Sequence, residues 1–241
     1  MDFNTGGDSG RPEDRPLYGE EAGGPTRGPA PGPAGSPGGE FNLQDPINSF
    51  VGTVRALVRD PVGFFRSIAR RGDFVNPLIF AAICALISAL LGGIISLALS
   101  PLFAGPGDTG GEVLAGGIAG FVANLILTPI FVVIVLFIGA AITHLLVMLL
   151  VRPQNAGFEA TFRVGAYSQV TQLVGWIPII GWLVAVVWAI VLSIFGIREV
   201  HSTSTGTAVL VVLIPVGVLL LLGILLGAAL VALLIGSQQQ F

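Results

Sequence analysis

The positions of the arginines constrain the fold of this chain more than any other feature. From Pro77 to Gly236 the sequence is almost continuously apolar, its interruptions hold Arg152, Arg163 and Arg198, and five more arginines precede the first apolar run. Basic residues near the ends of membrane spans stay on the cytoplasmic side. A five-span threading with the N-terminus inside places all eight of these arginines on that side. The sequence therefore predicts an all-α, polytopic membrane helix bundle with five transmembrane spans.

The composition also indicates that most of the chain is surrounded by lipid. Only 10% of the residues are charged and the mean hydropathy is +0.88, whereas soluble domains carry about 25% charged residues. We expect a multi-pass protein of the cell (cytoplasmic) membrane, with the N-terminus cytoplasmic and the C-terminus outside. The first 44 residues lack the apolar core of a secretory signal. No concentrated basic face is present, so we expect no nucleic-acid partner.

The chain before the first apolar run divides into two parts. Residues 1–44 contain seven Pro and eleven Gly, a composition that cannot bury enough surface to order itself, which predicts a disordered, acidic cytoplasmic tail. Residues 45–75 follow with two helix starts, Asp45-Pro46 and Asp60-Pro61. Apolar residues recur there at helical spacing and arginines flank them. These amphipathic helices could lie in the membrane interface or pack on the cytoplasmic end of the bundle. The arginines expected to contact anionic lipid headgroups are Arg55, Arg59, Arg66, Arg70 and Arg71.

The membrane domain is predicted to cover residues 76–236, followed by a short tail at 237–241. The predicted spans cover about 77–100, 121–150, 164–180, 182–197 and 207–235. The apolar stretch 113–151 would form a helix of roughly 58 Å, too long for one simple crossing. Counting it as one crossing keeps the later arginines inside. We therefore expect a break or kink near Thr128-Pro129, with residues 112–120 as an outer lead-in.

Residues 164–197 leave an alternative open. They are interrupted by Pro178, Gly181 and the two tryptophans Trp176 and Trp182, which predicts a tight turn near an interface. Each arm has only about 17 residues, the lower limit for a crossing. Two crossings and a re-entrant hairpin both return the chain to the same side, so the arginine positions do not separate them.

Few residues could carry chemistry inside the predicted spans. His144 is the only ionisable side chain placed within a span, and such residues are candidates for function. Ser168, Thr171 and Gln172 share one helical face, where they either bind neighbouring helices or line a path for a solute. No cluster has the spacing of a metal site, and no catalytic motif is present, so we expect no enzyme activity and no cofactor.

Small residues at four-residue spacing predict close helix packing, first within the bundle and second between copies. The residues expected to serve this role are Gly92, Gly93, Gly223 and Gly227.

Several short motifs occur in an order that resembles the Yip family of five-span membrane proteins, related to the Rab/Ypt-interacting factors. The motifs, covering roughly Asp60 to Leu230, are Asp60-Pro61-Val62-Gly63-Phe64-Phe65, Pro77-Leu78, Gly165-Ala166-Tyr167-Ser168, Ile177-Pro178-Ile179-Ile180-Gly181, Trp188 and Gly196-Ile197-Arg198-Glu199-Val200-His201. The spans are similar in number and order to those of bacterial members. The resemblance implies a cytoplasmic N-terminus and no known catalytic centre. Eukaryotic members look like adaptors for small GTPases, but their Tyr-Gly-Pro motif is not reproduced, because Tyr18-Gly19 is followed by Glu20.

The functional hypothesis is a non-enzymatic integral membrane scaffold or adaptor. Its cytoplasmic loops and interfacial helices would meet anionic lipid, a membrane-protein partner or a second copy. The alternative is a small-solute transporter or channel that uses His144 and the face of Ser168 and Gln172. A third hypothesis is the sensing of membrane stress or curvature by the amphipathic helices.

Overall fold

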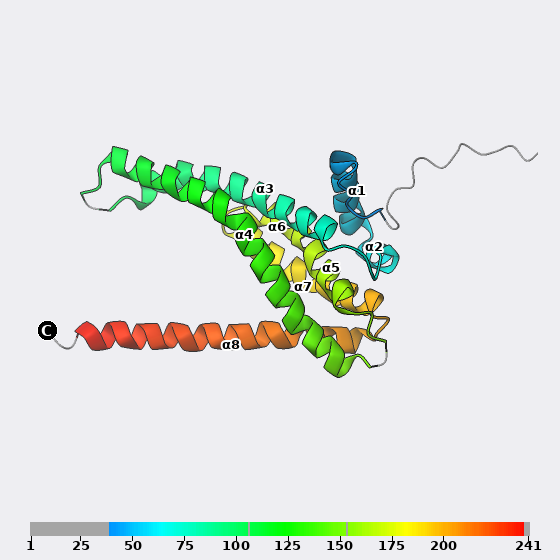
Figure 1. Cartoon of the computed structure of the whole chain (residues 1–241). Helices are drawn as coiled ribbons and strands as arrows, with labels where there is room; N and C mark the ends of the chain where they lie inside the picture. The colour runs from blue at the N-terminus through cyan, green and yellow to red at the C-terminus, as the bar shows by residue number, and fades with distance from the viewer. Residues whose placement is uncertain (1–38, 106, 153, 239–241) are drawn as a thin grey trace, which may run out of the picture. The chain divides into compact units, whose positions relative to one another are not determined.

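The computed structural model describes residues 39–105, 107–152 and 154–238, and all secondary structure in this part of the chain is helical. Most of the predicted tail, residues 1–38, and the last three residues lie outside the described part. The α-helices are α1 (Pro46–Arg59), α2 (Pro61–Ser67), α3 (Val75–Leu99), α4 (Gly110–Leu150), α5 (Phe158–Ser168), α6 (Gln172–Gly175), α7 (Ile180–Val200) and α8 (Thr205–Gln238) (Figure 1). The 3₁₀ helices are η2 (Ser100–Phe103) and η3 (Gln169–Thr171).

Four of these helical segments are long and apolar enough to cross a membrane: Val75–Phe103, Gly110–Leu150, Ile180–Val200 and Thr205–Ala232. They coincide with the first, second, fourth and fifth predicted spans, and they make the chain a multi-pass membrane protein. The third predicted span, 164–180, falls instead on α5, η3 and α6. This segment is interrupted by a 3₁₀ turn and carries Arg163 in its first half, so it is not a long apolar helix. A count of five spans therefore stays a prediction.

Proline and acidic residues start the short helices as expected. Pro46 and Pro61 occupy first-turn positions, and the Asp60 carboxylate accepts a hydrogen bond from the Gly63 N–H at 2.8 Å. At the start of α4, Thr109 and Glu112 form a reciprocal capping box. This box begins the helix eleven residues before the predicted span start at residue 121. The predicted outer lead-in is thus the first part of one continuous helix.

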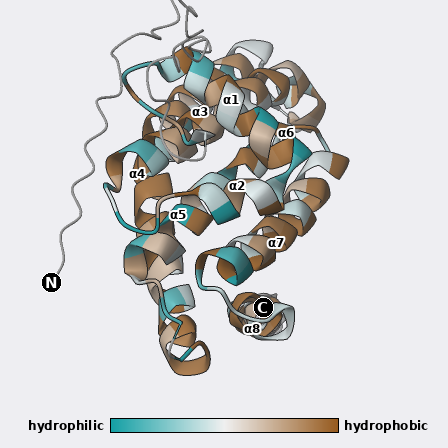
Figure 2. Ribbon diagram, turned by 90° about the vertical axis from the view of Figure 1, so that its right-hand side faces the viewer, coloured by the Kyte–Doolittle hydropathy of each residue, from teal (hydrophilic) through white to brown (hydrophobic). Residues whose placement is uncertain are grey.

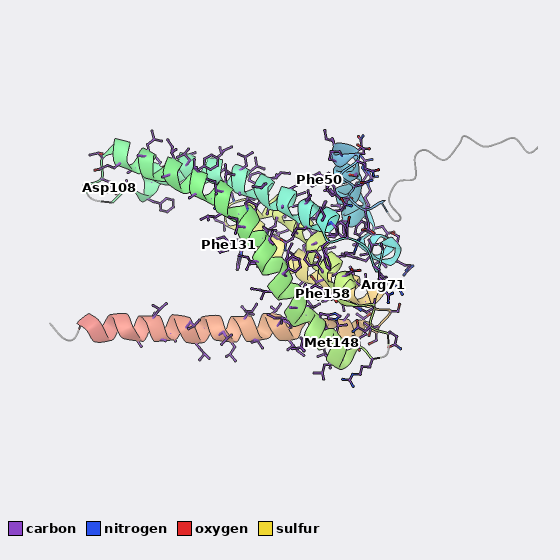
Figure 3. The ribbon with its side chains drawn as sticks, viewed as in Figure 1. Phe50, Arg71, Asp108, Phe131, Met148 and Phe158 are labelled. Carbon is purple, nitrogen blue, oxygen red and sulfur yellow. The ribbon has the colours of Figure 1, made fainter. Side chains whose placement is uncertain are left out.

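Helix α4 is 41 residues long and contains Pro129. Its first part runs beside α3, and near Phe131 it changes direction and continues towards the start of α8 (Figures 1 and 3). Proline removes one backbone hydrogen bond and crowds the preceding turn, which is the usual cause of such a bend. The predicted kink near Thr128-Pro129 is therefore present, within a helix that does not break.

Five helix ends meet at one end of the bundle. The Arg66 guanidinium, in the last turn of α2, pairs with Glu199 at the end of α7, and the Gly72 N–H, just before α3, donates to Glu159 at the start of α5. Thr161 of α5 lies 3.0 Å from His144 near the end of α4 and 3.1 Å from His201, just before α8. Of the eight arginines of the described residues, six lie in or next to these helix ends and two, Arg55 and Arg59, lie on α1, which packs against α2. We call this region the arginine end; Arg71 and Met148 lie there in Figure 3, far from Asp108.

From the arginine end, α5, η3 and α6 lead away and α7 returns. The turn between them contains Ile179, whose φ of 68° is unusual for a β-branched residue. The Ile180 N–H donates to the Pro178 carbonyl at 2.8 Å, which closes a three-residue γ-turn. The tight turn predicted at this place is confirmed.

The buried core also lies at the arginine end. Its fully buried large side chains come from five helices and from the segment before α1: Phe41, Leu57, Phe65, Phe80, Phe162, Tyr167, Leu192 and Ile197. By contrast, α8 is exposed from residue 217 to residue 232, a stretch that contains only apolar residues and glycine. Figure 2 looks along the axis of this helix, which lies at the edge of the bundle. Because these surfaces are apolar and face no described residue, they contact the lipid bilayer.

The boundary predicted for the tail is too late. Glu40 and Phe41 are buried at 6% and 1% exposure, although both fall within the range 1–44. Phe41 stacks near Phe80 of α3, and Thr53 of α1 donates to the Gly39 carbonyl at 2.9 Å. The last residues of the predicted tail therefore belong to the folded domain.

Candidate functional site

A buried ion pair joins the segment before α1 to α5. The Glu40 carboxylate bonds to the Arg163 guanidinium, and the two side chains are only 5% and 6% exposed. Glu40 also accepts hydrogen bonds from the Tyr167 hydroxyl at 2.9 Å and from the Ala69 N–H at 2.6 Å. Arg163 donates in addition to the Asp73 carbonyl at 3.0 Å. This network holds residues 40, 69 and 73 against α5, and so it fixes α1 and α2 on the bundle.

A second buried network runs through two histidines. The Ala156 N–H donates to His201 Nδ1 at 3.1 Å, so His201 carries its proton on Nε2 and donates to Thr161 Oγ1. The Thr161 hydroxyl is then free to donate to His144 Nδ1 at 3.0 Å. Burial lowers the pKa of His201 to about 4, with smaller contributions from His144 and Arg70. His201 is therefore neutral at physiological pH and links the α4–α5 connection to the end of α7.

The outer surface of the arginine end combines apolar and basic side chains. On α1, Phe50 and Val54 pack against the core, whereas Ile47, Val51 and Val58 are 76%, 49% and 54% exposed. The apolar stripe predicted for this helix is thus only half covered by the chain. Its free half lies beside Arg55 and Arg59, and Val51 and Val58 of this half line a shallow groove together with these two arginines, Phe50 and Val54. We call this surface the α1 stripe.

The five arginines predicted to contact lipid headgroups have different surroundings. Arg66 is 69% exposed but pairs with Glu199, which Arg198 also contacts at 2.7 Å. Arg70 donates to the Ser202 hydroxyl at 3.1 Å. The remaining three are exposed and form no ion pair or hydrogen bond with any described residue: Arg55, Arg59 and Arg71. These three are the ones whose charge is available to a partner outside the chain.

A cleft of about 500 Å³ opens between α4, α5–α6, α7 and α8. Ser168, Thr171 and Gln172 all line it, as their shared helical face predicts. Thr171 donates to the Ser168 carbonyl at 3.0 Å, and Gln172 Nε2 donates to Gln169 Oε1 at 3.3 Å. Ser168 is only 4% exposed, and its hydroxyl has no hydrogen-bond partner among the described residues.

His144 does not join this polar face directly. It lies near the end of α4, outside the lining of the cleft, and its ring packs edge-on against Phe158. Thr161 is the only connection that the described contacts provide, since it both lines the cleft and bonds to His144. The four residues predicted as one intramembrane polar site therefore form a cleft wall and a separate histidine network.

The predicted packing glycines also divide into two groups. A Cβ on Gly93 would collide with the ring of Phe121 of α4, and one on Gly92 would lie 3.6 Å from the Trp176 side chain. Both allow close approach to α3. Gly223 and Gly227 face open space within the described chain, because this part of α8 has left the bundle. A packing role for these two would require a second molecule.

The sequence prediction missed most residues of the two buried networks and singled out only His144 of the histidine network. Glu40 was assigned to a disordered tail, Arg163 to an interruption of the apolar run, and His201 to no site. One signal was available: Glu40 and Phe41 end the Pro/Gly-rich region together, an acidic and an aromatic residue just before a helix start. No group of three or more metal-ligating side chains occurs among residues 39–238 that the structure describes.

Comparison with known proteins gives one match. The family model described as the Yip1 domain matches residues 55–234, which covers the bundle from the middle of α1 to the end of α8. Searches of curated proteins and of solved structures returned no significant match.

Proposed function

Since this chain belongs to the Yip1 domain family of membrane proteins, we propose that it acts as a non-enzymatic scaffold or adaptor in the membrane. Its arginine end presents a docking surface to a membrane-protein partner and to anionic lipid headgroups. The observation that carries this proposal is the α1 stripe, where three exposed apolar residues lie beside two unpaired arginines. Apolar surface next to unpaired positive charge suits a partner or membrane surface that is both apolar and anionic.

The rigid attachment of α1 supports this role. The Glu40–Arg163 network and the contact of Phe50 with Phe80 hold α1 in one orientation on the bundle. A surface held in place loses less conformational entropy when it binds than one that must first become ordered. The buried networks thus serve the α1 stripe by fixing the direction in which it faces.

The proposal includes a topology of five passes, with the third formed by α5, η3 and α6. The contacts at the arginine end support it, because the start of α5 and the end of α7 lie at this same end. Residues 158–175 must then cross the same thickness of membrane, away from the arginine end, that α7 crosses on its return. In this proposal the arginine end lies in the cytoplasm, as the positive-inside rule favours, and the C-terminus lies outside.

Capture from native membranes tests the scaffold role. Tagged full-length protein is compared with the double variant Val51→Ser/Val58→Ser, which changes only exposed side chains of α1. Leu102→Ser, which is 76% exposed at the opposite end of α3, serves as the matched control. We expect a reproducible set of partner proteins with the wild type and the control, and at least a fivefold loss with the double variant. Equal capture by all three proteins, or no partner with the wild type, would refute the proposal.

Lipid contact is tested separately with a spin label on Val51→Cys in a Cys84→Ala background, in lipid nanodiscs. With anionic lipid present, the label should become more accessible to oxygen and less accessible to a water-soluble relaxant. The variant Arg55→Gln/Arg59→Gln should lose most of this change. If the label is equally accessible to the water-soluble relaxant in neutral and anionic discs, α1 does not bind lipid in the proposed way.

The topology is tested by labelling single cysteines in intact cells with a reagent that does not cross membranes. Asp108→Cys should react from the exterior, and Ser202→Cys should react only after permeabilisation. Reaction of Ser202→Cys in intact cells would place the arginine end outside the cell and refute the proposed topology.

A further inference from the structure

The cleft between α4, α5–α6, α7 and α8 has apolar residues at its opening and polar residues in its interior. Its exposed lining residues are all apolar, and they lie on α4, α7 and α8: Val135, Gly139, Ile142, Trp182, Val186 and Leu219. Its polar lining residues, which include Thr161, Ser168 and Gln172, are all buried or half-buried. A cleft whose rim is exposed and apolar is unfavourable in water and favourable in lipid. This one opens through an apolar rim onto a polar floor, so lipid is the phase from which it can be filled.

The polar floor has free hydrogen-bonding capacity. The buried Ser168 hydroxyl has no partner, and an unpaired buried hydroxyl is costly. Among the described residues, nothing donates to Gln172 Oε1 and nothing accepts from Gln169 Nε2. The floor therefore offers the Gln172 amide oxygen as an acceptor, the Gln169 amide NH2 group as a donor, and the Ser168 hydroxyl, which can do either. A matching ligand carries both a hydroxyl group and a carbonyl oxygen.

No charged side chain is among the described residues that line the cleft. Arg163, the nearest guanidinium in the sequence, is already bound to Glu40 and Asp73. A phosphate or ammonium group placed on this floor would lose its hydration without gaining a counter-ion, at a large cost. The floor thus excludes charged headgroups.

We propose that this cleft binds an uncharged lipid with a free hydroxyl, of the diacylglycerol class, its head on the floor at Ser168, Gln169 and Gln172 and its chains leaving over the rim. A volume of about 500 Å³ lies within the usual range for small-ligand sites. The ligand's hydroxyl and ester carbonyls match the free groups of the two glutamines and of Ser168. This site goes beyond the scaffold role and does not depend on it.

Photolabelling of the full-length protein in nanodiscs tests the proposal. The probe is a diacylglycerol with a diazirine in one acyl chain, and the labelled peptides are identified by mass spectrometry. Competitors are unlabelled diacylglycerol and phosphatidic acid with the same acyl chains. We expect labelling on α4, α7 and α8 at the rim, and we expect diacylglycerol to compete at least tenfold more strongly than phosphatidic acid.

Gly139 offers a variant that blocks the rim, with a matched control. Gly139 and Gly116 both lie on α4, and a Cβ added to either would meet nothing within 4 Å, but only Gly139 lines the cleft. Gly139→Leu should reduce the specific labelling at least fivefold, whereas Gly116→Leu should leave it unchanged. Ser168→Ala should weaken diacylglycerol competition about fivefold, the value of one hydrogen bond. Its thermal stability should not fall, because the hydroxyl has no partner among the described residues.

Three results would overturn the proposal. The first is equal competition by phosphatidic acid, which would mean that the acyl chains alone are recognised. The second is labelling that Gly139→Leu leaves unchanged. The third is a cross-link between two copies of the chain at the rim in place of lipid labelling, which would make the cleft a contact between protein molecules. Partner capture through the α1 stripe is measured in a separate experiment. A negative result for diacylglycerol labelling therefore does not affect the scaffold proposal, and a negative result for capture does not affect the lipid site.

Discussion

The arginine end and the distal part of α8 are built by different rules, although both belong to one chain. At the arginine end, residues from several helices bury one another, and buried polar groups such as Glu40 and His201 find partners within the protein. Along α8 from residue 217 to residue 232, large apolar side chains are exposed and no neighbouring helix covers them. The first region is stabilised by its own interior. The second is stabilised by lipid, which leaves its sequence free to be uniformly apolar.

This difference has an energetic meaning. A buried ion pair contributes little net stability compared with apolar residues of the same size, but removing one partner is very costly. A lipid-facing side chain can be exchanged for another apolar one at almost no cost. Substitutions should therefore have large effects at the arginine end and small effects on distal α8, and four predictions follow this order. All use the free energy of unfolding, measured by detergent-induced denaturation in mixed micelles.

The largest effect is expected for Arg163→Met. The substitution leaves the Glu40 carboxylate buried without a counter-ion, and we expect a loss of about 3–5 kcal/mol. The control is Arg66→Met, whose guanidinium is mostly exposed and should contribute no more than about 1 kcal/mol. Equal losses in the two variants would show that the Glu40–Arg163 pair is solvated and that the two regions differ less than described.

The second effect concerns pH. Because the pKa of His201 is lowered to about 4 in the folded protein, the unfolded chain binds its proton first as the pH falls. The contribution of His201 is complete above about pH 6.5 and is lost between about pH 6.5 and 4, by up to about 3 kcal/mol. His201→Gln should remove this part of the pH profile. Since carboxylates titrate in the same range, the difference between wild type and variant is the quantity to compare; a difference that does not change with pH would contradict the prediction.

The third prediction compares two glycines. A Cβ on Gly196 of α7 would collide with Val164 of α5 and lie 3.2 Å from the Phe65 ring, so Gly196→Ala should cost about 1–3 kcal/mol. Gly223 has open space around it, so Gly223→Ala should cost nothing and should gain up to about 1 kcal/mol from the higher helix propensity of alanine. A large loss for Gly223→Ala, together with a change of oligomeric state in size-exclusion chromatography, would show that a second copy covers distal α8.

The smallest effect is a gain. Ile179 has a φ of 68° in the γ-turn before α7, a conformation that glycine adopts without strain. Ile179→Gly should stabilise the protein by about 1 kcal/mol, the lower end of the strain expected for such a residue. Ile180→Gly, one residue later at the first position of α7, should give no such gain, because only Ile179 has a positive φ. If both variants are destabilised, the turn is not strained.

The sequence predicted the parts of this fold that depend on local patterns. Apolar length located α3, α7 and α8 within a few residues, and Asp-Pro pairs located the starts of α1 and α2. The kink at Pro129 also follows from local chemistry, because proline acts on the turn that contains it. The start of α4 was misjudged even though the Thr109 and Glu112 capping box is visible in the sequence, because the glycine-rich residues 112–120 were interpreted as an outer lead-in to the span.

The buried networks could not be predicted in this way. Glu40 and Arg163 are 123 residues apart, and nothing in the Pro/Gly-rich composition around Glu40 indicates that one carboxylate leaves that region to be buried. Arg163 is an arginine near a membrane boundary, for which exposure to water is the ordinary expectation. Of the candidate polar site, the helical spacing of Ser168, Thr171 and Gln172 was sufficient to place them on one wall. The distance of His144 from that wall depended on how α4 bends.

The apolar rim of the cleft changes how its occupancy is controlled. A molecule that enters over Val135 and Leu219 arrives by lateral diffusion in two dimensions, not by collision from the aqueous phase. The concentration that determines occupancy is then the mole fraction of this molecule among the surrounding lipids. The occupancy of the cleft therefore depends on the composition of one membrane and not on the total amount of the molecule in the cell. Dilution into detergent lowers that fraction directly, and an occupant would be lost on extraction even when binding in the native membrane is strong.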